Sequence, residues 1–591
     1  MSARYSLFEE LKRRNVLRAA ALYAGAVWAL AQGISQLGPP LGAPEWITRW
    51  FVIAACVGFP FWIAFAWFYE FTPQGLKRES EIAPDDSVAH STGRKLDKWI
   101  IAVLAVAVVL LLTDRFISPR GAGGITDKSI AVLPLSNESD GKDQQYFSDG
   151  LSEDLITALS QFEGLKVIAR DSSFKFRNSS DDPKIIGEKL GVAHLLEGSV
   201  QRSGDVVRVS ATLINATDRT AVWSQHYDRP YKDLFALQDD ITQKVAAALK
   251  AKLLDNGKAA PQGDRPPSGS LDAWNAYSRG RFHAVLIDPA DARAAIVFFK
   301  QAIAIDPHYA RAYASLAYTW ATLGGTFLSG EEQRQAFVNG RAAAERALQL
   351  DPDMAMAHVS RAVLLQWADF DWTGAQAEYR RAVELAPNDS LPRFVLGLVS
   401  GTLGDARQAI PLIRRSIATD PRSGAGWYWL AWNLAATGQL DQAELAARKA
   451  IEVMPGKPFL PAGLALIQIQ RGEGNAALAT AQREPPGTWR DIALTFALQV
   501  GNDRAAADAA LKNLIAKNAD GSAYQIAGVY GLRKDPDDMF AWLDRAWDTR
   551  DPGIQRLLTD PFILRYKDDP RFAAFAKKVG LPTTTDAKAM P

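Results

Sequence analysis

The sequence predicts a multidomain chain with N-terminal transmembrane helices, an α/β domain and an all-α solenoid of helical repeats. Three observations predict this fold class. Long apolar runs precede residue 118, and runs of about 20 apolar residues are candidates for crossing a bilayer. Strand-like and helix-like patterns then alternate to about residue 254. From residue 271 onward, helical stretches recur at a nearly constant period, which is typical of stacked helix pairs.

The composition limits the classes of function. At 591 residues the chain exceeds the roughly 100–200 residues usual for one domain. It has 67 Lys and Arg against 66 Asp and Glu, so no global charge favours a nucleic-acid partner. The single cysteine, Cys56, lies in the second apolar run. A disulfide framework and cysteine-ligated metal sites are therefore excluded from the soluble part.

Residues 1–117 are predicted to form a membrane region with three spans, at about residues 19–40, 48–69 and 99–117. The third run has a short uncharged core, from Trp99 to Thr113, which is less than the usual length of a span. A buried or interfacial helix at this place, which would leave the whole chain cytoplasmic, therefore stays an alternative.

Basic residues predict the orientation of these spans. They cluster in the leader before residue 19 and again between Lys77 and Lys98, whereas the short loop between the first two spans has none. Loops rich in Lys and Arg stay in the cytoplasm. We therefore expect a multi-pass protein of the cell inner membrane with a cytoplasmic N-terminus and periplasmic soluble domains.

Small and flexible residues at 118–127 predict a linker, and residues 128–254 are expected to form the α/β domain. Ser129–Leu135 is apolar and rich in branched residues, as in a buried strand. A helix is expected after Phe147, with Ser148 or Asp149 as its N-cap. Alternating segments between Leu195 and Tyr227 predict a meander, and a helix is expected to close the domain.

These segments resemble a known domain. The collinear block of SIAVLPL, FSDGLSEDLITAL, LKVIARDSSFKF, LGVAHLLEGSVQRSGDVVRVSATLINATDRTAVWSQHYDR and LFALQDDITQKVAAAL is similar to the bacterial TolB N-terminal-like (FlgO-like) domain. The resemblance implies a non-catalytic adaptor. No propeller repeats follow, so the partners of TolB do not carry over. The leader SLFEELKRRNVLRAA and its spans resemble those of bacterial TolB-like membrane proteins with repeats, whose relatives sometimes carry a cyclase or winged-helix output domain that is not seen here.

Residues 255–270 predict a second linker, and residues 271–583 are expected to form the solenoid with a C-terminal cap. Prolines end its helical stretches at spacings of 45, 35, 34 and 34 residues, namely Pro307, Pro352, Pro387, Pro421 and Pro455. A period of about 34 residues with a terminal proline is the tetratricopeptide pattern. The longest spacing is expected to hold an insertion near residues 325–336.

The first helix of each repeat carries a second apolar stripe. Tyr428 and Trp432 form an i,i+4 pair that points about 120° away from the side packed on the repeat's own second helix. In tetratricopeptide folds these positions line the concave surface. The candidate residues for a peptide-binding groove are therefore Phe394, Leu398, Tyr428, Trp432 and Leu466. The alternative is that this stripe is covered and belongs to the core.

No motif for catalysis, cofactors or metals is found. The sequence lacks a P-loop, an HExxH helix, a G-x-S-x-G elbow and an EF-hand loop, and its histidines never pair at helical ligand spacing. We therefore expect no enzyme, no cofactor, no metal and no nucleic-acid binding.

The expected function is that of a membrane-anchored, non-catalytic scaffold, which presents a TolB-like domain and a repeat array to protein partners outside the cytoplasmic membrane. A small-molecule ligand stays open. The alternative is a transmembrane signalling or sensory protein related to TolB-like adenylate-cyclase-type regulators but without the catalytic domain.

Overall fold

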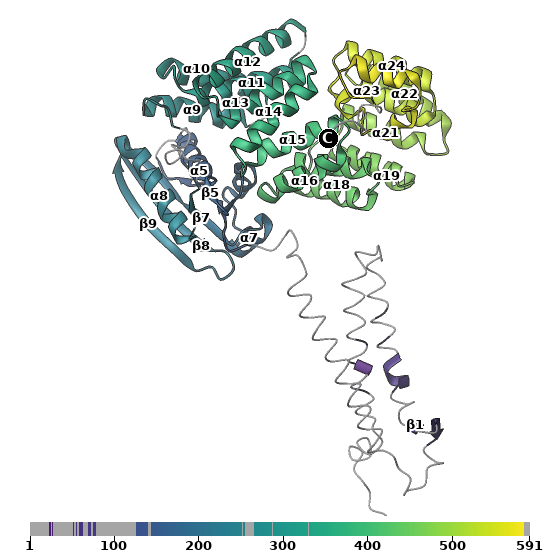
Figure 1. Ribbon diagram of the computed structural model, residues 1–591, viewed down its shortest axis with the longest axis horizontal. Helices are drawn as coiled ribbons and strands as arrows, with labels where there is room; N and C mark the ends of the chain where they lie inside the picture. The colour runs from purple at the N-terminus through teal and green to yellow at the C-terminus, as the bar shows by residue number, and fades with distance from the viewer. Residues whose placement is uncertain are drawn as a thin grey trace, which may run out of the picture. The chain divides into compact units, whose positions relative to one another are not determined.

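The computed structural model describes residues 126–139, 144–250, 265–285, 288–328, 330–519 and 521–583, strand residues 252–253 and short pieces before residue 79. The chain divides into two compact units, Met1–Gly124 and Ile125–Pro591. The described pieces of the first unit include a hairpin of β1 (Tyr69–Thr72) and β2 (Gly75–Arg78). All other strands, and all the helices named below, belong to the second unit (Figure 1).

The predicted fold class is wrong in its transmembrane helices, and the predicted multi-pass localisation in the inner membrane is wrong with it. Within the described ranges, no helix is both long and apolar enough to cross a bilayer. Helix α12 (Gly330–Leu350) has 21 residues, but Glu331, Arg341 and other charges interrupt it. Helix α11 (Ala310–Phe327) has 18 residues and is built largely of alanine, glycine, threonine and serine. The predicted spans at 19–40, 48–69 and 99–117 fall almost wholly outside the described residues.

The α/β part is a mixed sheet with the strand order β6-β3-β7-β8-β9. Strand β3 is parallel to both β6 and β7, and β7, β8 and β9 form the expected antiparallel meander. A two-residue turn joins β7 to β8, and its Gly204 has a φ of 58°, which glycine adopts at little cost. The strands are β3 (Ser129–Val132), β4 (Ser136–Asn137), β5 (Phe162–Glu163), β6 (Lys166–Val167), β7 (His194–Ser203), β8 (Val206–Asn215), β9 (Ala221–Pro230) and β10 (Lys252–Leu253).

Helices cover both faces of this sheet. The larger core lies under α5 (Gln145–Leu159) and α8 (Leu234–Ala248), and a smaller one lies under α7 (Pro183–Leu190). The predicted N-cap of the first helix is wrong, because α5 begins at Gln145 and contains Ser148 and Asp149. The short elements α6 (Arg170–Ser173), η4 (Phe174–Phe176) and η5 (Tyr231–Asp233) complete this part.

Consecutive antiparallel helix pairs form the repeat array, and the tetratricopeptide prediction is confirmed. Buried alanines such as Ala443 and Ala450 let the paired helices approach closely. The extra residues of the long repeat extend α11 and α12. The other helices are α9 (Leu271–Ala284), α10 (Pro289–Ile305), α13 (Ala355–Leu364), η6 (Leu365–Asp369), α14 (Trp372–Leu385), α15 (Ser390–Thr402), α16 (Ala406–Thr419), α17 (Gly424–Ala436), α18 (Leu440–Val453), α19 (Leu460–Gln470), α20 (Gly474–Arg483), α21 (Thr488–Gln499), α22 (Arg504–Asn518), α23 (Ala523–Arg533), α24 (Pro536–Asp548), η7 (Pro552–Arg556), η8 (Leu564–Tyr566) and α25 (Pro570–Lys578).

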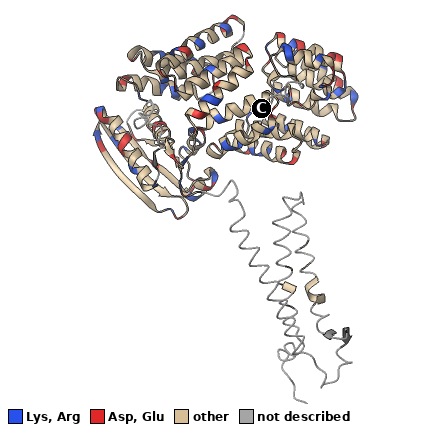
Figure 2. Cartoon of the chain, in the orientation of Figure 1, with Lys and Arg blue, Asp and Glu red and all other residues tan. Residues whose placement is uncertain are grey.

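Acidic and basic side chains are interspersed along the described helices, in keeping with the nearly equal totals of the two charge types (Figure 2). Many of them pair on the helix surface, as Arg448 does with Glu444 one turn away. Exposed pairs of this kind contribute little to stability. The array is therefore held together mainly by its apolar clusters.

Candidate functional site

The residues predicted to line a peptide groove do not form one open surface. Tyr428, Trp432 and Leu466 are 9%, 2% and 6% exposed and belong to one buried cluster. Phe394 is half-buried against a different cluster, and Leu398 is half-buried. The structure thus brings three of the five residues together, in a core.

The C-terminal segment of the chain, residues 551–583, covers this face. The guanidinium of Arg556 lies 4.6 Å from the ring centroid of Trp432, and Phe562 packs into the same cluster. Farther along, the indole Nε1 of Trp372 donates to the carbonyl of Val579 at 2.9 Å. The segment therefore turns back from the end of the array onto earlier repeats. Peptide binding by the groove stays a prediction that requires this segment to move away.

The acidic cluster on α5 joins the sheet to the first repeat. The buried carboxylate of Asp154 accepts hydrogen bonds from Trp274 Nε1 at 2.9 Å and Gln238 Nε2 at 2.7 Å. Glu153 pairs with Arg281 at 2.7 Å and also with Arg170. Both carboxylates therefore link α5 to the helix that follows the second linker, α9.

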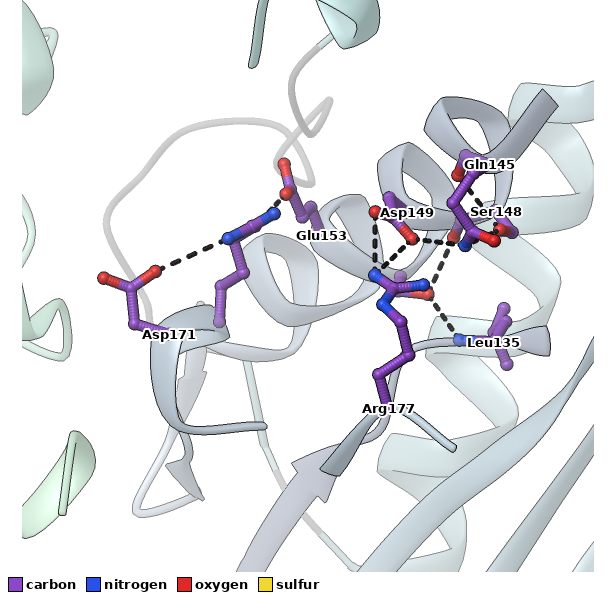
Figure 3. A network of polar contacts seen from close by, with 9 residues as sticks. Leu135, Gln145, Ser148, Asp149, Glu153, Asp171 and Arg177 are labelled. Carbon is purple, nitrogen blue, oxygen red and sulfur yellow. Dashed lines mark hydrogen bonds and ion pairs between the residues drawn. The ribbon is translucent and has the colours of Figure 1, made fainter. Parts of the chain in front are cut away.

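Asp149, the first acidic residue of the cluster, has partners only from the α/β part among the described residues. Asp149 accepts from Arg177 at 2.7 and 2.8 Å and from Gln145 at 2.9 Å (Figure 3). Figure 3 also shows Glu153 and Asp171 on opposite sides of one arginine side chain, in agreement with the ion pairs of Arg170. Asp149 and Glu153 are buried and paired with arginines, and they therefore join α5 to the segment that follows β6.

A second contact joins α6 to the end of α16. The amide of Ala169 donates to the carbonyl of Thr419 at 2.8 Å, and Ser172 Oγ hydrogen-bonds with the carboxylate of Asp420. The amide of Arg422 donates to the same hydroxyl at 2.8 Å. Burial raises the pKa of Asp420 to about 6. In the sequence Asp420 is only the residue before Pro421, which ends a helical stretch, and its partner Ser172 lies 248 residues away.

A cavity of about 510 Å³ lies between the α/β part and the first repeat. We call it the basic–aromatic pocket. Its walls come from α5, β7, α9 and α10, and it is lined by Tyr146, Arg202, Asp272, Asn275, Ala276, Arg279, Gln301, Ala304 and Ile305. No motif in the sequence points to it, since these residues are distributed over 160 positions and are ordinary surface types when taken singly.

Two aromatic rings position the two arginines of this pocket. The guanidinium of Arg202 lies 3.7 Å from the ring centroid of Tyr231, and that of Arg279 lies 4.6 Å from that of Tyr146. Arg279 also donates to the Tyr146 hydroxyl at 3.3 Å. Among the described residues, neither guanidinium has a carboxylate oxygen within 4.0 Å.

The amide of Asn275 is only half engaged. Its Nδ2 donates to the hydroxyl of Tyr231 at 2.6 Å, while its Oδ1 is buried and has no partner within the described part of the chain. Burial raises the pKa of the Tyr231 phenol, and the charge of Arg202 acts in the opposite direction. Arg202 Nε also donates to the carbonyl of Gly204, at 3.4 Å. Among the described residues, the pocket thus offers two guanidiniums that are not neutralised by a carboxylate and one acceptor without a donor.

The described residues contain no group of three His, Cys, Asp or Glu side chains that could hold a metal ion. The arrangement of the basic–aromatic pocket fits the binding of an organic molecule or an anion, because its polar groups are guanidiniums, amides and a single carboxylate.

A comparison with protein families matches residues 126–244 to the second domain of HilA/YgeH-like transcriptional regulators. The resemblance of the same region to the TolB N-terminal-like domain stays a prediction. A protein named "Putative adenylate cyclase 3" from Rhizobium meliloti (strain 1021) is 32% identical over 320 residues. That match covers 54% of this chain and 42% of the relative, so the chain spans less than half of the relative's length.

Solved structures resemble the repeat array. One is the crystal structure of YrrB, a TPR protein with an unusual peptide-binding site, which is 18% identical, with a TM-score of 0.26 over 36% of this chain and 97% of that one. Another is PilW, a type IV pilus biogenesis factor, which is 19% identical, with a TM-score of 0.30 over 34% of this chain and 93% of that one.

Proposed function

We propose that residues 126–583 form a non-catalytic protein-interaction scaffold, and that the free edge of strand β9 is its contact site for an extended segment of a protein partner. The observation that carries this proposal is the position of β9. It is ten residues long, ends the strand order of the sheet, and among the described strands pairs only with β8.

The backbone of an edge strand can bind another strand. Its outward N–H and C=O groups have no ladder partner, and an added strand satisfies them while its alternate side chains give specificity. All residues of β9 except Tyr227 are exposed or half-buried. The charged residues Asp228 and Arg229 near its end limit unselective pairing between copies of the chain.

The rest of the unit supports this edge. The sheet is fixed to the first repeat through Asp154 and Trp274, and to a middle repeat through Ser172 and Asp420. Two separate contacts restrict the rotation of the sheet relative to the helix array more than one contact would. A partner bound to β9 would therefore keep a defined orientation relative to the helix array.

A second candidate is a role in signalling, in which the same unit passes a regulatory input to a partner. The match of residues 126–244 to a domain of transcriptional regulators favours it. The Rhizobium meliloti relative is named as a putative adenylate cyclase, which is also a signalling protein. The match covers 42% of that relative, so its named activity is not transferred to this chain.

Site-specific photocrosslinking in cells tests the scaffold proposal. A photoreactive residue at Val222 or Ser224, both exposed on β9, should capture one partner in the full-length protein. The matched control is the same probe at Leu445, which is 69% exposed on α18. Hydrogen exchange with the captured partner should then slow the amides of β9 more than those of α18. Equal capture at Leu445, or unchanged exchange in β9, rejects the edge as the contact site.

A further inference from the structure

We infer that the basic–aromatic pocket binds a small molecule that carries a carboxylate or phosphate together with an N–H donor. This inference is independent of the proposed scaffold role, because the pocket involves none of the residues of β9. It follows from two guanidiniums without a carboxylate partner and one amide oxygen without a donor in the described part of the chain, which line one cavity.

The two arginines define the anionic part of the ligand. A guanidinium is a planar fork of donors that matches carboxylate and phosphate oxygens. Arg202 and Arg279 already rest on tyrosine rings, so their side chains lose little freedom when they bind an anion. One carboxylate, Asp272, also lines the pocket, so the charged groups of the lining sum to an excess of one positive charge.

Asn275 defines the donor part of the ligand. Its buried Oδ1 lacks a partner because the amide donates its Nδ2 to Tyr231. If the amide is turned around, an N–H group loses its partner instead, so one polar atom is unsatisfied in either orientation. Native proteins satisfy nearly all buried polar atoms, so an exception calls for an explanation, and here the atom belongs to a residue that lines a cavity. A ligand N–H beside the anionic group would pair with Oδ1, and the carboxylate of Asp272 could accept a second donor.

The size and the apolar wall of the pocket fit a small organic molecule. Ligand sites commonly have volumes of about 300–1,000 Å³, and this cavity has about 510 Å³. Ala276, Ala304 and Ile305 form its apolar side, and Ile305 is 48% exposed without a ligand. A carbon skeleton lying there would cover this side chain. Amino acids with an acidic side chain and nucleotides with an exocyclic amine both meet these requirements.

Isothermal titration of the full-length protein tests the inference with three probes: glutamate, AMP and inorganic phosphate. We expect glutamate or AMP to bind more tightly than phosphate, which lacks the N–H donor. Stronger binding of glutamate assigns the carboxylate, and stronger binding of AMP assigns the phosphate. Binding of phosphate alone, or of none of the probes at millimolar concentration, overturns the inference.

Variants locate the binding within the pocket. Arg202→Gln and Arg279→Gln should each weaken the better probe by about tenfold to a hundredfold, the range for losing a hydrogen bond to a charged group. Asn275→Ser should weaken glutamate or AMP but not phosphate. The control Arg334→Gln changes an exposed arginine of α12 and should bind like the wild type. Wild-type affinity in both arginine variants, with unchanged circular dichroism melts, overturns the inference.

Discussion

Two of the regions in which arginines lie on aromatic rings differ in what else surrounds the guanidinium. Arg556 is 7% exposed, lies 4.6 Å from the centroid of Trp432 and 5.3 Å from that of Tyr524, and has the buried carboxylates of Asp551 and Asp560 nearby. In the basic–aromatic pocket, Arg279 rests on Tyr146 but is exposed. The same contact therefore stabilises the fold in one region and leaves a cation available in the other, and burial with acidic neighbours distinguishes the two.

The largest loss of stability is expected when the buried aromatic side chains around Arg556 are truncated. The double change Tyr428→Ala and Trp432→Ala should destabilise the protein strongly, since a buried Trp or Phe truncated to Ala costs about 3–5 kcal/mol by itself. Urea unfolding measures this loss. Trp367→Ala, at a tryptophan that is 36% exposed, is the control and should cost much less. An unchanged unfolding curve for the double variant would show that the C-terminal segment does not cover the groove.

Removal of the buried cation should have the next largest effect. Arg556→Gln leaves Asp551 and Asp560 buried with less compensation, and breaking such an arrangement costs about 3–5 kcal/mol. Thermal unfolding of this variant should be compared with Arg565→Gln, which removes an exposed arginine of the same segment that lies over Phe562. Equal melting temperatures for the two variants would contradict the structural role of Arg556.

The contact between the sheet and the middle repeats should respond to pH through Asp420. Burial raises its folded pKa to about 6 from 3.8, so ionisation is harder in the folded state than in the unfolded one. Its contribution to stability is therefore fully present below pH 3.8 and is lost as the pH rises through about 6. A shift of about two pKa units corresponds to about 3 kcal/mol.

The variant Asp420→Asn isolates this dependence. The difference in unfolding free energy between variant and wild type should increase in favour of the variant from about pH 4 to pH 6 and stay constant above that range. Chemical unfolding at a series of pH values measures the difference, in which the contributions of other titrating groups cancel. A difference that does not change with pH would show that Asp420 ionises as freely in the folded state as in the unfolded chain.

Local patterns predict the repeats well and the sites poorly. Regularly spaced prolines and small packing residues such as Ala443 predict the helix pairs, because each repeat contacts mainly its neighbours in sequence. The contact between Ser172 and Asp420 joins residues 248 positions apart, and no local pattern encodes it. Ser148 or Asp149 is predicted as an N-cap, but the helix starts earlier, at Gln145, and Asp149 pairs with Arg177 instead. The apolar stripe at Trp432 is visible in the sequence, whereas the segment that covers it is not.

The smallest loss of stability is expected for an arginine of the basic–aromatic pocket. Arg279→Gln removes a cation that lies over Tyr146 at an exposed position, where such a contact contributes about 0.5–1 kcal/mol. Without ligand, its unfolding free energy should therefore fall by less than about 1 kcal/mol, far less than for Arg556→Gln. Urea unfolding of both variants under the same conditions gives the ratio. If Arg279→Gln proved as costly as Arg556→Gln, the pocket arginine would be part of the core, and its lack of a carboxylate partner would not indicate a binding site.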